Sequence, residues 1–272
     1  MGDESAAVPD LGAPATLSLV IPAYNEEERL PALVETLKTS AADAVSAAGM
    51  ELLEVVVADD GSGDRSREIL RVAAEGDERL QPVFAYKENR GKGAAVAAGV
   101  ERARGDYVLL ADVDLSTPLE ELPKLTAALD DGADVAIGSR AVPGAVVERG
   151  PVHRKITGST FNGAVRLLTG LRLRDTQNGF KLFPAAAAKQ MLAEQTCPGF
   201  AFDVELLMRV DRAGLRIAEV PVLYLHDERS RVPVAAASVE MLKDVSGLAY
   251  RLRWRGRGGR AAAAHPGIVR RP

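Results

Sequence analysis

The segment Tyr107–Thr117 (YVLLADVDLST) decides how the rest of this chain can be arranged. Its first four residues are apolar and predict a short buried strand, which then runs into two aspartates. Side chains alternate along a strand, so Asp112 and Asp114 are expected on one side, where carboxylates about 5 Å apart repel by about 3 kcal/mol at an effective dielectric of about 20. A divalent cation that prefers oxygen ligands, Mg²⁺ or Mn²⁺, would relieve that repulsion. The alternative is a solvated turn in which Asp114 only begins the helix after Pro118.

The composition is that of an ordinary globular protein. The 272 residues are 47% apolar and 26% charged, which is enough for one large domain or two small ones with a real core. The formal net charge of −4 argues against nucleic acid as a partner. The single cysteine, Cys197, excludes an internal disulfide and is typical of a reducing compartment. Because we recognise neither a spanning apolar run nor a signal peptide, we expect a cytoplasmic protein that is at most peripheral on a membrane.

Apolar runs and helix-periodic segments alternate along the first half of the chain. The helix after the first strand is expected as one element over residues 30–48, ended by Gly49. Such alternation predicts right-handed crossovers and a mostly parallel central sheet flanked by helices. The expected strands are residues 17–21, 54–58, 82–86, 107–110 and 134–137.

Each of these strands is followed by a polar loop. Ligands bind beyond the carboxyl ends of parallel strands, so the loops are expected to form one binding rim. This convergence favours a ligand site over a solvated turn. The loops are Tyr24–Asn25, Asp59–Asp60, Asn89–Gly93, Asp112–Asp114 and Ser139–Arg140.

The second half of the chain has no boundary clean enough to separate two independent domains. A loop with proline and glycine at residues 141–150 is expected to be mobile. The expected helices are residues 152–169, one from about 184 and one from 202, and a strand pair is expected at 217–220 and 222–226. We expect a disordered leader over residues 1–15, one domain over 16–250 and a basic disordered tail over 256–272.

Seven ordered motifs of this chain resemble glycosyltransferase family 2. They are Val20–Glu26, Asp59–Ser62, Asn89–Gly93, Asp112–Asp114, Gly138–Arg140, Asp175–Lys181 and Phe202–Glu205. The resemblance covers about residues 17–250 and implies the GT-A fold, a Rossmann-like α/β fold of nucleotide-diphospho-sugar transferases. The last two motifs look most like the dolichyl- and polyprenyl-phosphate β-glucosyltransferase branch. The resemblance implies a nucleotide-sugar-binding half at 16–140 and an acceptor half at 141–232. The apolar periodicity of the carboxyl-terminal segment predicts an amphipathic helix at 235–254.

The resemblance also implies a donor site. Three of the residues implied in this site have a structural alternative. Glu26 could instead interact with a helix dipole, Asp60 could instead fix the conformation of its loop, and Lys92 could instead be a solvated loop lysine. Asp112 would contact the ribose or the metal, and Asp114 would bind the metal and act in catalysis. The residues implied in nucleotide-sugar binding are Pro22, Ala23, Tyr24, Glu26, Asp59, Asp60, Lys92 and Asp112.

An acceptor site is implied in the second half. Asp203 and Glu205 lie two apart on an expected helix, so at most one of them would reach the sugar, and Glu205 has a structural cap as its alternative. The residues implied in acceptor or phosphate binding are Arg140, Arg149, Arg154, Lys155, Gln177, Lys181 and Glu205. Those implied in catalysis are Asp114, Arg140, Asp175 and Asp203.

The reaction implied is an inverting transfer of a sugar, glucose from UDP-glucose, onto a polyprenyl phosphate of the dolichyl or undecaprenyl type, with Mg²⁺ or Mn²⁺. A phosphate acceptor is already ionised, because its second pKa lies near ~6, and needs no base. The alternatives are another donor such as GDP-mannose, a soluble hydroxyl acceptor that would need a base, or a nucleotide-sugar-binding protein without turnover. Apolar residues at helical steps from Val239 to Leu252, with five arginines between Arg251 and Arg260, predict either a membrane-surface helix or a helix packed on the sheet.

Overall fold

A computed structural model describes residues 13–148, 162–226 and 234–254 of the chain. These residues form one seven-stranded sheet and one short parallel pair of strands. The main strands are β1 (Ala15–Ala23), β2 (Met50–Asp59), β3 (Leu80–Phe84), β4 (Tyr107–Leu110), β5 (Val135–Ser139), β7 (Lys181–Pro184) and β8 (Ile217–Pro221). The short pair is β6 (Val146–Val147) with β9 (Leu223–Tyr224).

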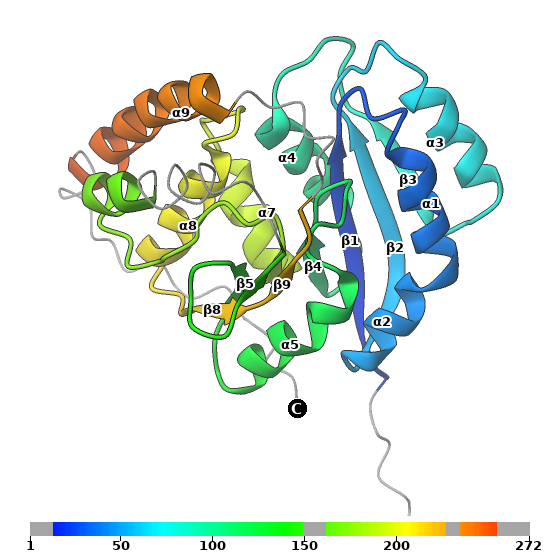
Figure 1. Cartoon of the computed structure of the whole chain (residues 1–272), viewed down its shortest axis with the longest axis horizontal. Helices are drawn as coiled ribbons and strands as arrows, with labels where there is room; N and C mark the ends of the chain where they lie inside the picture. Colours follow the sequence, from blue (N-terminus) through cyan, green and yellow to red (C-terminus); the bar gives the residue numbers. More distant parts are fainter. Residues whose placement is uncertain (1–12, 149–161, 227–233, 255–272) are drawn as a thin grey trace, which may run out of the picture.

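Helices follow most strands and cover both faces of the sheet (Figure 1). The first half contributes α1 (Leu30–Thr39), α2 (Ala41–Ala47), α3 (Ser66–Glu75), α4 (Lys92–Arg102), the 3₁₀ turn η1 (Leu119–Glu121) and α5 (Leu122–Asp130). The second half contributes a helix at residues 162–169, α7 (Ala185–Ala193), α8 (Phe202–Arg212), α9 (Val234–Ala249) and the π-helical turn η2 (Tyr250–Trp254).

The main sheet has the order β3-β2-β1-β4-β7-β5-β8. Strand β7 runs antiparallel to both β4 and β5, whereas the other neighbouring pairs are parallel. The predicted α/β fold with a mostly parallel sheet is therefore confirmed. Because β1, β2 and β4 run in the same direction, the loops that leave them meet at one edge, at the top of Figure 1.

Two hydrophobic clusters fill the space between the sheet and its helices. On β1, Leu17, Leu19 and Ile21 pack in the cluster that includes α1, α2, α3 and α5. Val20, which alternates with them, packs in the other cluster with α4, α7, α8 and α9. A strand that is covered on both faces needs apolar residues at nearly every position, which is why the first strand was readable in the sequence.

Several element bounds differ from those expected. The helix expected over residues 30–48 is two helices, because Ser40 adopts a φ of −131° and interrupts the backbone between α1 and α2. Strand β3 begins at Leu80 because that residue pairs with Val55, and the segment after Phe84 leaves the sheet. The expected strand pair after Ile217 is divided between the two sheets, since β8 pairs with β5 and β9 pairs with β6.

Other expectations fall partly or wholly outside the described residues. Residues 149–161, which include Arg149, Arg154 and Lys155, lie outside them, as do most of the expected leader and the tail after residue 254. β1 begins at Ala15, the last residue of the expected leader, and the loop expected to be mobile contains β6. Of the expected helix at 152–169, residues 162–169 are described and are helical.

The carboxyl-terminal helix α9 packs against the protein. Val245 and Leu248 are fully buried, Met241 and Ala249 are nearly so, and Met241, Val245 and Leu248 belong to the cluster that contains α8. This packing favours a helix that packs on the protein, although its main partner is α8 and not the sheet that the second interpretation named. Within the described ranges, no helix combines the length and apolarity that crossing a bilayer requires.

Candidate active site

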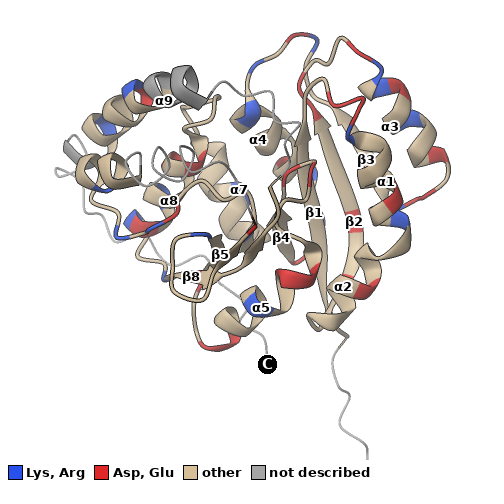
Figure 2. Ribbon diagram, in the orientation of Figure 1, with Lys and Arg blue, Asp and Glu red and all other residues tan. Residues whose placement is uncertain are grey.

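Acidic and basic residues occur in the loops at the carboxyl ends of β1, β2 and β4 (Figure 2). Asp59 is the last residue of β2 and pairs in register with Ala23 at the end of β1. Asp112 and Asp114 follow β4, and the backbone N–H of Ala111 donates to the carbonyl of Val20. The three aspartates that the sequence predicted on one rim therefore lie at the same edge of the sheet.

Asp112 is paired with Lys92, the first residue of α4. Lys92 Nζ lies 2.6 Å from Asp112 Oδ1, and Lys181 and Arg140 add positive charge nearby. Burial by itself raises the pKa of Asp112, but Lys92 and the two other cations outweigh it and hold that pKa below its ordinary value. Burial likewise opposes the charge of Lys92, but Asp112 and the neighbouring carboxylates raise the pKa of Lys92 well above normal. Both groups are therefore ionised at neutral pH.

Asp114 is held by a residue that the sequence analysis did not single out. Arg29 donates two hydrogen bonds of 2.6 Å to Glu26, and its Nη1 lies 3.6 Å from Asp114 Oδ2. The other carboxylate oxygen accepts from the backbone N–H of Ser116. Leu115, between them, has a φ of +43°, which is uncommon for a residue with a branched side chain and marks a constrained turn.

The Asp112–Asp114 turn fits a divalent cation. Both carboxylates reach the surface, with 37% and 16% of their side-chain area exposed. Gly179 packs against Asp112 so closely that a Cβ there would lie 2.4 Å from Asp112 Oδ2. No cluster of three or more potential ligand residues occurs in the part of the chain that the structure describes. Two carboxylates that leave the remaining positions to water and a diphosphate suit Mg²⁺ or Mn²⁺.

Asp59 is engaged inside the protein. Its residue is fully buried, its Oδ1 accepts from the backbone N–H groups of Gly61 and Ser62, and Arg67 Nε lies 2.5 Å from the same oxygen. Arg67 also donates to the carbonyl of Tyr86. In this arrangement Asp59 offers no exposed oxygen to a base, and Arg67 is the partly exposed member of the pair.

Asp60 fixes the neighbouring loop. Its carboxylate accepts from the Nδ2 of Asn89 at 2.9 Å and from the backbone N–H groups of Arg90 and Gly91 at 2.9 and 2.7 Å. Burial raises the pKa of Asp60, and these donors only partly offset that effect. The contacts favour the loop-fixing alternative for this residue.

The loop after β1 exposes an aromatic ring. Pro22 and Ala23 belong to β1, and Tyr24 beyond them is 45% exposed. The next residue, Asn25, has a φ of +53°. Its backbone N–H donates to Ser62 Oγ, and its Oδ1 accepts from a second residue of the loop that contains Ser62, the backbone N–H of Gly63. The loop is thus tied to the one after β2, and the ring of Tyr24 remains available to stack on a base.

Arg140 and Asp175 form the second charged pair of the site. The guanidinium donates to both carboxylate oxygens at 2.7 and 2.9 Å and lies 5.0 Å above the ring of Tyr224. Burial raises the pKa of Asp175, but Arg140 outweighs it and the pKa is lowered. Glu219 on β8 accepts from the backbone N–H groups of Arg174 and Asp175 and so holds this loop.

Three of the predicted acceptor contacts have structural partners instead. Lys181 is fully buried, and its Nζ lies 2.5 Å from Asp203 Oδ1 and bonds to the carbonyl of Asn178. Glu205 is also fully buried and accepts from Arg209 and from the backbone N–H groups of residues 196 and 197. Its placement favours the capping alternative. Gln177 points its Nε2 toward the sulfur of Met241, 3.7 Å away.

Residues that sequence reasoning missed include Arg29, Arg67, Glu219 and Tyr224. Arg29 and Arg67 follow their motifs by a few residues, in or next to helices, where charged residues are common. Glu219 and Tyr224 are distant in sequence from the Arg140–Asp175 pair that they contact, and only the folded chain brings them to it. The sequence therefore carried no specific signal for these residues.

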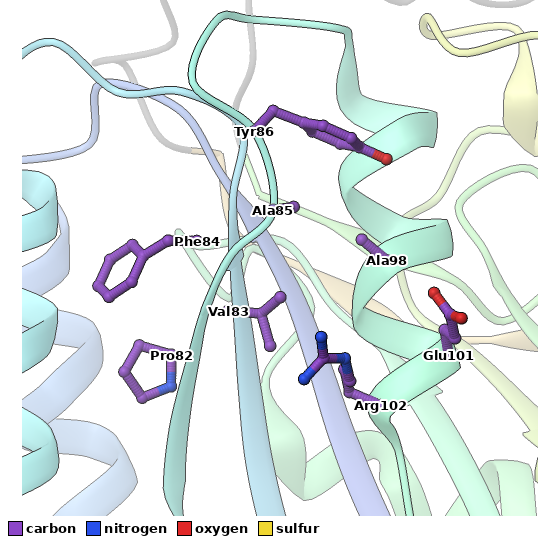
Figure 3. Close-up of a pocket in the computed structure, with 8 residues that line it drawn as sticks. All are labelled: Pro82, Val83, Phe84, Ala85, Tyr86, Ala98, Glu101 and Arg102. Carbon is purple, nitrogen blue, oxygen red and sulfur yellow. The ribbon is translucent and has the colours of Figure 1, made fainter.

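A separate hollow of about 440 Å³ lies between the end of β3 and α4 (Figure 3). Val83 and Ala85 form its floor, and Ala98 faces them from α4. Glu101 and Arg102 lie at one end and Tyr86 at the other. Among the predicted site residues that the structure describes, none lines this hollow.

The sheet and its acidic turn place the chain among the α/β proteins whose ligands bind beyond the carboxyl ends of parallel strands. More specifically, the chain belongs to glycosyl transferase family 2, whose family model matches residues 18–196. The glycosyltransferase AglD of Haloferax volcanii is 35% identical over 238 residues, which cover 85% of this chain but only 35% of AglD.

Two further relatives match over most of their length. The dolichyl-phosphate β-glucosyltransferase of Drosophila melanogaster is 33% identical over 240 residues, covering 84% of this chain and 73% of the relative. The human dolichyl-phosphate β-glucosyltransferase is 32% identical over 247 residues, covering 88% and 75%.

Solved structures show the same fold. Glucosyl-3-phosphoglycerate synthase from Mycobacterium tuberculosis in complex with UDP has a TM-score of 0.60 at 22% identity, covering 88% of this chain and 80% of that one. The same enzyme with Mn²⁺, UDP and glucosyl-3-phosphoglycerate has a TM-score of 0.59 at 21% identity, covering 86% and 80%. At this identity the likeness concerns the fold.

Proposed function

We propose that this protein is an inverting, metal-dependent glycosyltransferase that moves glucose from UDP-glucose onto a polyprenyl phosphate. The names of the fly and human relatives support the sugar and the class of acceptor. Complexes of the mycobacterial synthase with UDP and Mn²⁺ support the nucleotide and the metal.

On the donor side, the exposed charges fit a nucleotide diphosphate. Lys92 and Arg140 both place positive charge near Asp112, where a diphosphate would lie beside the carboxylates. Asp112 and Asp114 would hold one divalent cation, which supplies neutralisation of the charge that develops on the leaving diphosphate. Tyr24 offers an exposed ring for the base.

The state of the carboxylates is the observation that carries the acceptor assignment. A hydroxyl acceptor needs a general base, and the sequence offered Asp175, Asp203 and Glu205 for that role. Asp175 is paired with Arg140 and its pKa is lowered, Asp203 is paired with buried Lys181, and Glu205 is fully buried. None of the three is placed to take a proton, whereas an ionised phosphate can attack without a base.

Peripheral contact with a lipid surface is part of the proposal. Since the described part of α9 turns its apolar face inward, such contact would use other residues, and Leu167 and Tyr250 are 81% and 62% exposed. Co-sedimentation of the full chain with vesicles that contain polyprenyl phosphate tests this. Binding that is lost in Leu167→Ser supports it, and no binding to vesicles at any lipid concentration contradicts it.

A donor and acceptor panel tests the reaction. Purified full-length protein with Mg²⁺ or Mn²⁺ is expected to move label from UDP-glucose, rather than GDP-mannose or UDP-GlcNAc, to a polyprenyl phosphate. Transfer to a soluble alcohol but not to the lipid phosphate would support the hydroxyl-acceptor alternative. Saturable donor binding without transfer to any acceptor would support a binding protein.

A further inference from the structure

A small cavity lies directly behind the Asp112–Asp114 turn. Its volume is about 10 Å³, close to the minimum that holds one water molecule. Asp112 contributes to one wall and Tyr224, which stacks on Arg140, to another. The cavity therefore adjoins both Asp112 and the aromatic ring that stacks on Arg140. Its lining residues are Asp112, Ser116, Thr117, Asn178, Gly179, Phe180 and Tyr224.

Two polar atoms from residues that line this cavity are buried without a partner. Within the described residues, neither Ser116 Oγ nor Asn178 Nδ2 makes a hydrogen bond. The two residues are only 6% and 2% exposed, so bulk water does not satisfy them. Buried polar groups are nearly always paired, and two orphans around one cavity indicate a missing partner.

The orientation of the Asn178 amide is fixed by its neighbours. Its Oδ1 accepts from the backbone N–H of Phe180 at 3.0 Å and from Thr117 Oγ1 at 3.3 Å. A flipped amide would place an NH₂ group against the N–H of Phe180, which is unfavourable. Nδ2 therefore keeps its two hydrogens for another acceptor, and Ser116 Oγ can both donate and accept.

We infer that this cavity is a subsite for a single oxygen atom, which accepts from Asn178 Nδ2 and bonds to Ser116 Oγ beside Asp112. The inference rests on the proposed function, because the cavity adjoins the carboxylate assigned to the donor. A hydroxyl of the donor's sugar and an ordered water molecule present the same chemistry. The former would make Asn178 a specificity-determining residue, and the latter would make it a positioning residue that acts through water on Asp112.

Two glycines allow the backbone to approach closely around the subsite. Gly179 brings its backbone against Asp112, and Gly138 lies close to the Asn178 amide, where a Cβ would be 3.3 Å from Nδ2. Larger side chains at either glycine would push these groups apart. The narrow fit explains why only one small group has room.

Binding measurements on matched variants separate the two occupants. Asn178→Asp keeps the Oδ1 contacts and removes the donors, and Ser116→Ala removes the hydroxyl alone. Thr176→Val is the control, because Thr176 is equally buried on the same loop but does not line the cavity. Dissociation constants are measured by calorimetry for UDP-glucose and for UDP, each with Mn²⁺.

If a sugar hydroxyl fills the subsite, the dissociation constant of both test variants for UDP-glucose rises about tenfold, while that for UDP does not change. If a water molecule acts through Asp112, the affinity of both test variants falls by the same factor for UDP-glucose and for UDP. Unchanged affinity for both ligands, together with a dry cavity in a high-resolution crystal structure of the free protein, overturns the inference. Should the wild type bind neither ligand, the proposed function fails, and the presence or absence of the water in that crystal structure still decides the subsite.

Discussion

Two lysine–aspartate pairs in this protein have the same chemistry and different surroundings. Lys92 and Asp112 lie 2.6 Å apart with 23% and 37% of their side chains exposed. Lys181 and Asp203 lie 2.5 Å apart with 0% and 6% exposed. Solvent reaches the first pair, so a ligand can approach either partner, whereas the second pair is sealed inside the protein. Exposure rather than residue type therefore separates the charges that can do chemistry from those that hold the fold.

The two environments lead to opposite expectations for the stability lost when a pair is broken. A pair that borders solvent is screened by water and salt more than a sealed pair is, so breaking it should cost less stability. At low energetic cost, a diphosphate can replace Asp112 as the partner of Lys92, and a cation can replace Lys92 as the partner of Asp112. Breaking a buried pair leaves an uncompensated charge, which is strongly unfavourable.

The largest expected effect is on activity at the exposed rim. Asp114→Asn removes a ligand for the cation and is expected to lower the rate of sugar transfer by at least about a hundredfold, with little change in unfolding. Steady-state transfer assays and thermal unfolding measure the two outcomes. Glu120→Gln, an exposed change nearby, is the control. Full activity in Asp114→Asn would remove the metal role from this residue.

The buried pair is expected to show the largest effect on stability. Asp203→Ala leaves Lys181 charged and unpaired and should lower the free energy of unfolding by about 3–5 kcal/mol. Urea unfolding followed by circular dichroism measures this. The double variant Lys181→Met with Asp203→Leu removes both charges and should recover most of the loss. A loss under about 1 kcal/mol in the single variant would show that the pair is not structural.

Arg29 offers a sharper test of the exposed rim. The positive charge of Arg29 lies 3.6 Å from Asp114, so Arg29→Gln should raise the affinity for Mn²⁺ severalfold. Titration followed by Mn²⁺ electron paramagnetic resonance measures the affinity. Arg65→Gln, which breaks an exposed pair with Glu68, is the control. A lower Mn²⁺ affinity would mean that Arg29 instead orders the turn.

The smallest expected effect is a pH dependence from Asp175. Burial raises and Arg140 more strongly lowers its pKa, so the net shift is downward, and the pair stabilises the folded state above the unfolded pKa of about 3.9. That contribution is lost as the pH falls through the lower folded pKa. The stability difference between the wild type and Asp175→Asn should therefore be constant above about pH 5 and shrink below about pH 4. A difference that grows in acid would contradict the sign of the shift.

Sequence reasoning predicted the sheet and the edge at which the motif loops meet. Alternating apolar strands and helices could be recognised because both faces of the sheet are covered, and loops after parallel strands must share one edge. The same reasoning could not predict that the helix over residues 30–48 is interrupted at Ser40, because a break of one residue leaves the apolar periodicity intact. Nor could it divide β8 from β9 between two sheets.

By itself the sequence determined the α/β class, the family and the rim that carries Asp112 and Asp114, because these follow from local periodicity and from the direction of parallel strands. Only the tertiary structure decided which carboxylates are available. Lys92 and Lys181 look alike in the sequence, yet one reaches solvent and the other does not, because burial depends on segments far apart along the chain. The same is true of Arg67 and of Asn178 Nδ2, which has no hydrogen-bond partner among the described residues, because their surroundings exist only after those segments pack.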